Sequence, residues 1–259
     1  MSNKKDLDEK KATEVALMEQ FEEDANDGIN LQQEDMALPF IKICSSQDDE
    51  LIEQLDGVKA GDVYNSVTLD FYKGSDGIKV IPCAYQRRYI RWAARGEGTG
   101  APIAIYTPEE QRPKTERNVD NKDMVIDGEG HYIEETHQHY VLQVLEDGTT
   151  QPGLISMKST QLKKSRNWNS LVGSRSQMGK NGPFVPARYS HIYNLETVKE
   201  NNSKGNWHGW KITVAASLIE DNRADLYQLA KGFAHSINKG EVVVKHETES
   251  AETEGDVPF

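Results

Sequence analysis

Hydrophobic and polar positions alternate in short runs along most of this chain, and that alternation predicts strands rather than long helices. Residues 63–92 carry Val, Tyr, Ile and Phe at strand spacing and contain the turn sequence KGSDG at residues 73–77. The segment HYVLQVLEDGTTQPGLISM, residues 139–157, predicts a hairpin with Asp147-Gly148 near its turn. Two later runs, residues 187–198 and 207–219, return to strand character.

One stretch near the end of the chain has the spacing of an amphipathic helix, at residues 225–238. Its apolar positions Leu226, Leu229, Phe233 and Ile237 recur every three or four residues and form a stripe. The stripe predicts a late helix that packs on the strands through these four side chains.

A shorter helix is predicted at residues 160–172, within a basic segment. Ser159 or Thr160 is placed to cap its first turn, and Gly173 is placed to end it. Residues 108–130 are polar and charged instead, which predicts a loop or an excursion between strands.

These elements predict a mostly β protein with some α structure, in which a small barrel is the natural way to close the strands. Apolar residues are sparse before residue 36, so residues 1–35 are expected to form an acidic arm that is weakly helical or disordered. Residues 36–240 are expected to form the core. Residues 241–259 are expected to form a disordered acidic tail.

The charge of the chain is unevenly distributed. The formal net charge of the 259 residues is −12, which at first argues against a nucleic-acid partner. Residues 63–245, however, hold 20 acidic and 24 basic side chains, and residues 148–195 hold seven Lys or Arg and no acid. The excess negative charge lies toward both ends, so a basic central surface is predicted.

Several classes of protein are not favoured. The chain has no run of 18 apolar residues and no hydrophobic segment after its first lysines, so we expect no membrane association and a cytoplasmic location. Cys44 and Cys83 cannot build a disulfide framework or a zinc ribbon, and we expect both to be reduced and buried.

Few features of the sequence indicate an enzyme. His131, His137 and His139 beside Glu134 and Glu135 could form a metal cluster, since the H-x-H spacing places two imidazoles on one face of a strand. A polar strand without a metal is the favoured interpretation, because no third ligand has a recognised spacing. Phosphate loops of the Walker type and G-x-S-x-G elbows are missing, so we expect neither an enzyme nor a cofactor.

The segment YQRRYIRW has a pattern suited to single-stranded nucleic acid. In a strand, Tyr85, Arg87, Tyr89 and Arg91 share one face, which alternates aromatic rings with cations. Unpaired bases stack on rings while phosphates attract guanidinium groups. The alternative is a half-buried strand whose rings belong to the core and whose arginines meet surface acids.

The acid-free stretch adds further candidates for a nucleic-acid surface, in which cations alternate with aromatic side chains. They are Lys163, Lys164, Arg166, Trp168, Arg175, Lys180 and Arg188. A cationic helix followed by a glycine-containing loop could close over a flexible strand of DNA. The alternative is a solvated basic face with aromatic core anchors.

The terminal sequence GDVPF and the segments LPFIKI, GVKAGDVYNSVT and GIKVIPCAYQRRYIRW carry a resemblance. The chain resembles single-stranded DNA-binding proteins of the OB-fold type, and in particular phage-encoded ones. The resemblance covers residues 36–95 and the last few residues. It implies an OB-fold-like barrel with insertions that binds single-stranded DNA in the bacterial host's cytoplasm during replication, recombination and repair. It leaves open whether the protein forms a homo-oligomer.

The resemblance also implies a role for the acidic tail. Asp256, Val257, Pro258 and Phe259 would bind replication or recombination proteins, with the Phe259 ring filling an apolar pocket. The tail would otherwise lie over the basic groove until DNA displaces it. Two alternatives remain for the whole protein: a recombination mediator or strand-annealing protein and, less favoured, a metal-dependent nuclease.

Overall fold

The computed structural model describes residues 2–25, 27–28, 37–46, 48–94, 96–98, 100–126, 128–202, 205–242 and 244. The chain divides into two compact units, Met1–Met36 and Ala37–Phe259. The first unit contains helix α1, Ser2–Glu23, which lacks Gly and Pro and is rich in good helix formers. Large apolar side chains of α1, such as Met18 and Phe21, are exposed.

The second unit is mostly β, as predicted. Its strands are β1 Ile41–Ile43, β2 Val63–Asn65, β3 Phe71–Tyr72, β4 Ile78–Trp92, β5 Ala104–Tyr106, β6 Thr115–Arg117, β7 Asp123–Val125, β8 Tyr132–Val144, β9 Thr150–Lys158, β10 Gln177–Gly179, β11 Gly182–Phe184, β12 His191–Asn202 and β13 Gly205–Ser217. Its helices are α2 Asp49–Gln54, the 3-10 turn η2 Ser159–Gln161, α3 Leu162–Gly173, the 3-10 turn η3 Arg188–Ser190 and α4 Ala224–Asn238.

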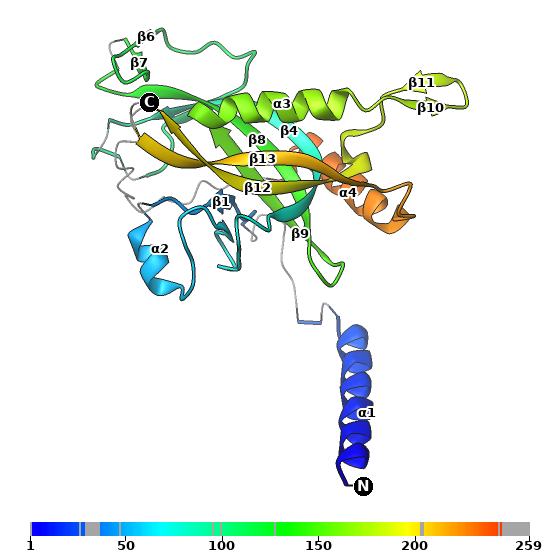
Figure 1. The fold of residues 1–259 in the computed structure, drawn as a ribbon. Helices are drawn as coiled ribbons and strands as arrows, with labels where there is room; N and C mark the ends of the chain where they lie inside the picture. The colour runs from blue at the N-terminus through cyan, green and yellow to red at the C-terminus, as the bar shows by residue number, and fades with distance from the viewer. Residues whose placement is uncertain are drawn as a thin grey trace. The chain divides into compact units, whose positions relative to one another are not determined.

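An eight-stranded antiparallel sheet forms the frame of this unit (Figure 1). Its order is β13-β12-β4-β8-β7-β6, with β5 paired to β4 and β9 paired to β8. The long strands β4 and β8 run side by side over almost their whole lengths. A small sheet has the order β1-β2-β3, and β10 and β11 form a separate two-stranded sheet.

Two contacts join the small sheet to both sides of the large one. Phe40 forms a parallel bridge with Leu154 of β9. On the other side, the Thr197 amide of β12 donates to the Gly74 carbonyl, 2.8 Å away, in the turn after β3. The large sheet therefore curls into a half-barrel, which agrees with the predicted barrel-like fold.

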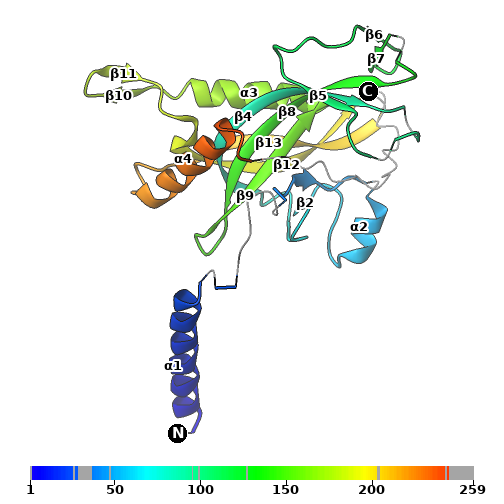
Figure 2. The same cartoon turned by 180° about the vertical axis from the view of Figure 1, so that it is seen from behind.

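The two faces of the curled sheet bury different clusters. The cluster of the α3 side contains Ile41, Val63, Ile78, Val80, Val141, Ile155, Met157, Trp168, Tyr193, Leu195 and Trp210. The other face is covered by α4, seen from behind in Figure 2. Helix α4 was predicted correctly, but its buried face is Leu226, Ala230, Ala234 and Ile237, and Leu229 is 56% exposed. The stripe is displaced because small alanines allow close approach to the sheet.

The predicted turns and loops have mixed outcomes. The β8–β9 hairpin is confirmed, with Gly148 at a φ of 86° in its turn, a conformation that favours glycine. The predicted excursion contains the β6–β7 hairpin, in which Arg117 donates two hydrogen bonds to Asp123, of 2.9 and 3.0 Å. Helix α3 begins at Leu162 behind Gln161, which makes no side-chain cap bond, so the predicted caps are wrong.

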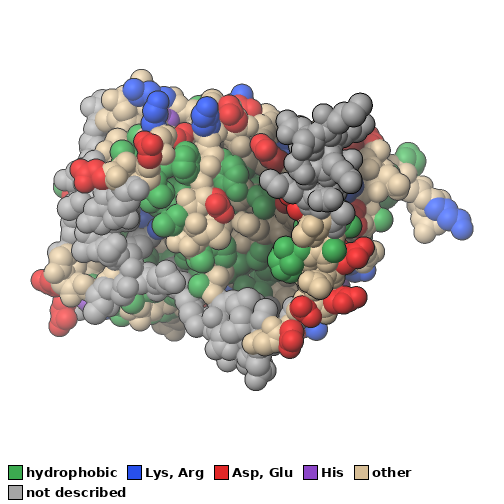
Figure 3. Space-filling model, turned by 90° about the horizontal axis from the view of Figure 1, so that it is seen from below, with side chains coloured by type: hydrophobic (Ala, Val, Ile, Leu, Met, Phe, Trp, Pro, Cys, Tyr) green, Lys and Arg blue, Asp and Glu red, His purple; other side chains and the backbone are tan. Residues whose placement is uncertain are grey.

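The expectation that Cys44 and Cys83 are buried is confirmed. In the described ranges, we find no helix whose length and apolar content would let it cross a lipid bilayer. Viewed from below, hydrophobic side chains gather near the centre, with Asp and Glu side chains among and around them (Figure 3).

Candidate nucleic-acid interface

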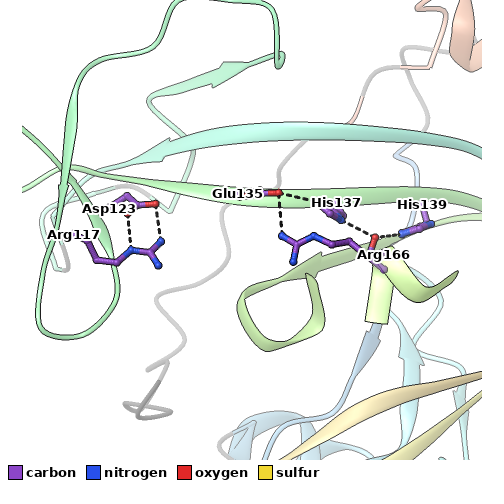
Figure 4. Close-up of polar contacts among 7 residues, drawn as sticks. Arg117, Asp123, Glu135, His137, His139 and Arg166 are labelled. Carbon is purple, nitrogen blue, oxygen red and sulfur yellow. Dashed lines mark hydrogen bonds and ion pairs between the residues drawn. The ribbon is translucent and has the colours of Figure 1, made fainter. Parts of the chain in front are cut away.

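Helix α3 lies on the face of β8 that carries the H-x-H pair, and Ser165 joins the two elements. The Ser165 hydroxyl lies 2.7 Å from His137 Nδ1 and 2.7 Å from His139 Nε2 (Figure 4). Ser165 and Trp168 are the buried residues of the helix, one turn apart, so they face the sheet together. The side of α3 that carries its cations is thereby turned outward.

The direction of every hydrogen bond in this buried network follows from Arg188, which can only donate. Arg188 donates to His139 Nδ1, 2.9 Å away, so the His139 proton lies on Nε2 and points to Ser165. Ser165 in turn donates to His137 Nδ1. His137 then donates from Nε2 to Glu135, 2.9 Å away.

The network leaves the predicted histidine pair without a free nitrogen. Burial, followed by the nearby Arg188 charge, holds the pKa of His139 well below its usual value of 6.5, so His139 is neutral. His131 is used elsewhere, since Arg91 contacts its Nδ1 at 2.9 Å. Among the residues that the structure describes, no three His, Cys, Asp or Glu side chains are grouped to hold a metal ion.

The predicted face of β4 is confirmed by its register with β8. Tyr85 pairs with His139 and Tyr89 with Glu135, so the alternating Tyr and Arg side chains lie on the α3 side of the sheet. Tyr85 is half-buried, with its ring centroid 5.1 Å from that of His139, and burial raises its pKa. Part of the Tyr85 ring therefore packs against the buried network and is not available to a ligand.

Tyr89, further along β4, lies among arginines. The Arg112 guanidinium is 3.6 Å from the centre of its ring, and that of Arg87 is 5.8 Å away. Arg166 of α3 reaches toward the same place, with Nη2 3.8 Å from a carboxylate oxygen of Glu135. We call Arg87, Tyr89, Arg112 and Arg166 the arginine patch. Arg112 was not predicted, because nothing in its loop sequence indicates that it folds over a strand.

A second basic feature lies on the opposite side of α3, against the β12–β13 hairpin. This basic cleft has a volume of about 600 Å³ and is lined by Thr160, Lys163, Lys164, Asn167, Lys199, Glu200, Asn201 and Trp207. Glu200 accepts from Lys164 and from the Trp207 indole, the latter at 3.0 Å, so it fixes both side chains. Lys163 and Lys199 are exposed, and neither has an ion-pair partner among the described residues.

The cleft and the patch are linked across the first turns of α3. Lys163 and Arg166 are three residues apart, which places them on the same outer side of the helix. Lys163 lines the cleft, and Arg166 belongs to the patch. A path of cations therefore runs from Lys199 over the helix to Arg87, with an aromatic ring near each end.

Two of the predicted nucleic-acid-binding residues are buried and do not lie on this surface. Trp168 is only 1% exposed, and its ring stacks on His139 with centroids 4.5 Å apart. It belongs to the core and is not available to a base. Arg188 is likewise turned inward, donates to Asn169 at 2.8 Å, and has its pKa lowered to about 10, chiefly by burial.

The remaining predicted residues are spread along the chain after α3. Arg175 is partly buried in the segment that leads into β10, and Lys180 is exposed at the turn between β10 and β11. The predicted partner-binding residues Asp256, Val257, Pro258 and Phe259 lie outside the described residues.

Comparison with known proteins points to a phage family. A family model described as Pam3 phage gp34-like protein matches residues 8–243. Neither the curated proteins nor the solved structures contain a match to this chain.

Proposed function

The chain belongs to the Pam3 phage gp34-like family, and we propose that this phage protein binds single-stranded DNA with little dependence on base sequence. The observation that carries the proposal is the cationic path across α3, which joins the basic cleft to the arginine patch. Each end of the path has an aromatic ring, Trp207 in the cleft and Tyr89 in the patch.

The composition of this path suits an unpaired strand. Lysine and arginine attract the phosphates of any sequence, and an aromatic ring offers a stacking face to any base. Trp207 is held by Glu200 before a ligand arrives, so little of its side-chain freedom remains to be lost on binding. Sequence tolerance follows because these contacts do not read the edges of bases.

Two carboxylates would compete with the nucleic acid. Glu200 already pairs with Lys164, and Glu135 lies beside Arg166. A phosphate that uses either cation has to share it with a fixed neighbouring acid. Lys163, Lys199 and Arg87 form no ion pair with an acid among the described residues, so we expect them to contribute more.

In a phage-infected cell, this activity would protect single-stranded intermediates of replication and recombination. The tail residues Asp256 to Phe259 would recruit partner enzymes, because they combine a carboxylate, a proline and an aromatic ring within an acidic segment. Binding and recruitment would then use separate parts of the chain.

The proposal is tested by titrating single-stranded and double-stranded oligonucleotides of equal length at several salt concentrations. We expect a preference for the single strand and a linear loss of affinity with salt on a log-log plot. The Lys163→Ala/Lys199→Ala variant should flatten that slope by about 0.7 for each phosphate that is no longer neutralised.

The matched control removes the same charge elsewhere. Lys79 of β4 and Lys231 of α4 are exposed lysines. Lys79 lies between Ile78 and Val80, which face the α3 side, so its side chain and α4 are on the opposite face of the sheet from the path. The Lys79→Ala/Lys231→Ala variant should keep the wild-type slope. Equal slopes in all three proteins, or no binding of single strands by the wild type, would refute the proposed surface.

A further inference from the structure

The β10–β11 hairpin exposes apolar side chains at an unusual density. Its strands are joined by the two-residue turn Lys180-Asn181, and it projects from the second unit beyond the end of α3 (Figures 1 and 2). Met178 is 80% exposed, Phe184 is 45% exposed and Val185, just after the hairpin, is 54% exposed. In Figure 3 the same projection carries hydrophobic and Lys or Arg side chains near each other.

The Phe184 ring packs against its own hairpin although it is partly exposed. It lies over Gly179 of the opposite strand, because a Cβ added at Gly179 would come within 2.9 Å of Phe184 Cδ1. The pairing of Gln177 with Phe184 makes Gly179 the diagonal neighbour of the ring. The glycine therefore supports one part of the ring and leaves the rest open to solvent.

The positive charge near the Phe184 ring indicates which kind of ligand the hairpin would bind. The hairpin lies within residues 148–195, which hold seven basic side chains and no acid, and Lys180 is exposed at its turn. Lys180 has no ion-pair partner among the described residues, and an aromatic face on the same hairpin as this cation is complementary to an unpaired base and its phosphate. A purely apolar protein partner would leave this cation without a counter-charge.

We propose that Phe184 is a base-stacking platform, held by Gly179, on which the hairpin receives a nucleobase of the bound strand. This inference rests on the proposed function, since it adds a contact for the same ligand. The β10–β11 hairpin would then be part of the surface that binds single-stranded DNA. Stacking occurs without readout of base identity, so it keeps the sequence tolerance of the path across α3.

The first test compares Phe184→Ala with Val185→Ala, which removes an exposed apolar side chain next to it. Loss of a stacking platform should weaken binding of a single-stranded oligonucleotide about 5- to 150-fold. The salt slope should stay at the wild-type value, because the ring has no charge. Val185→Ala should bind as the wild type does.

The second test moves the ring without removing it. Gly179→Ala adds a methyl group where the Phe184 ring lies, and it should also weaken binding, by less than Phe184→Ala. In Phe184→Trp the new indole should lose fluorescence when a thymidine oligonucleotide is added, beyond any change in the wild type, which has four Trp residues.

The outcomes separate the two proposals. If the wild type binds single strands and Phe184→Ala binds them with equal affinity, the platform is refuted while the cationic path stands. Absence of extra quenching in Phe184→Trp would have the same meaning. A wild type that does not bind single strands at all overturns both proposals.

Discussion

Lowering the pH from 7 to 5 should destabilise the protein through His139. The buried network keeps this imidazole neutral in the folded state, because Nδ1 accepts from Arg188 and burial holds the pKa well below 6.5. In the unfolded chain the same side chain takes up a proton near pH 6.5. The unfolded state therefore binds more protons than the folded state below that pH, and stability rises with pH through this window.

The size of the effect follows from the protonation equilibrium. Each pH unit below 6.5 costs about 1.4 kcal/mol for one histidine that stays neutral when folded, so His139 removes about 2 kcal/mol at pH 5. Burial lowers the pKa of His191 as well, and it contributes in the same direction. The measured pH dependence of the wild type should therefore include both residues.

The assay is urea unfolding between pH 5 and 8 for the wild type and His139→Gln. The variant should show a pH dependence of the unfolding free energy that is smaller by up to about 1.4 kcal/mol per pH unit below pH 6.5. Ile155→Val is the control, since Ile155 pairs with His139 across the β8–β9 ladder and does not titrate. It should cost about 0.5 to 1.5 kcal/mol at every pH. Identical pH dependence in wild type and His139→Gln would refute the neutral buried imidazole.

Three further predictions concern packing, stacking and the tail. Trp168→Ala should cost about 3 to 5 kcal/mol of unfolding free energy in urea titrations, because the ring is fully buried, and it should leave the DNA affinity of the folded fraction unchanged. Tyr89→Ala should weaken binding of single-stranded oligonucleotides by about 1 to 3 kcal/mol in fluorescence titrations, whereas an unchanged affinity would assign that ring to packing with Arg112. Deletion of residues 247–259 removes five carboxylates, so affinity at low salt should hold or rise, while Phe259→Ala should lose partners in pull-downs from host lysate and keep its DNA affinity.

Local patterns predicted the strands and their faces well. The period of two along YQRRYIRW placed Tyr85 and Tyr89 on one face, and the register with β8 agrees. The basic helix was also expected close to its observed range, Leu162–Gly173. In both segments the signal is contained in neighbouring residues, so no distant contact is needed to read it.

The position of Trp168 could have been read from the sequence. Leu162, Ser165, Trp168 and Val172 recur at helical spacing among polar residues, which indicates the buried side of an amphipathic helix. The composition of the segment as a whole drew attention to its cations instead. In a basic helix, the spacing of the apolar residues therefore predicts whether an aromatic side chain is exposed. The occurrence of an aromatic residue among cations does not.

Other residues of the interface depend on contacts between distant segments. Trp207 and Lys199 enter the basic cleft because the β12–β13 hairpin lies beside α3, and Arg112 reaches Tyr89 from a loop. Local spacing has no information about which loop or hairpin meets which helix. Phe184 needed the cross-strand position of Gly179, which becomes visible only with the register of β10 and β11.

The hydrogen-bond network under α3 has a consequence for how this family can vary. Because Arg188 sets the direction of donation, each of the following groups has a single allowed role, ending with Glu135 as an acceptor at the surface. An apolar substitution at Ser165 leaves the His139 Nε2–H donor and the His137 Nδ1 acceptor each without its partner in the core, at a cost in stability. Family members that lack one of these residues are therefore expected to replace the others as well, so the network should be inherited or discarded as a set.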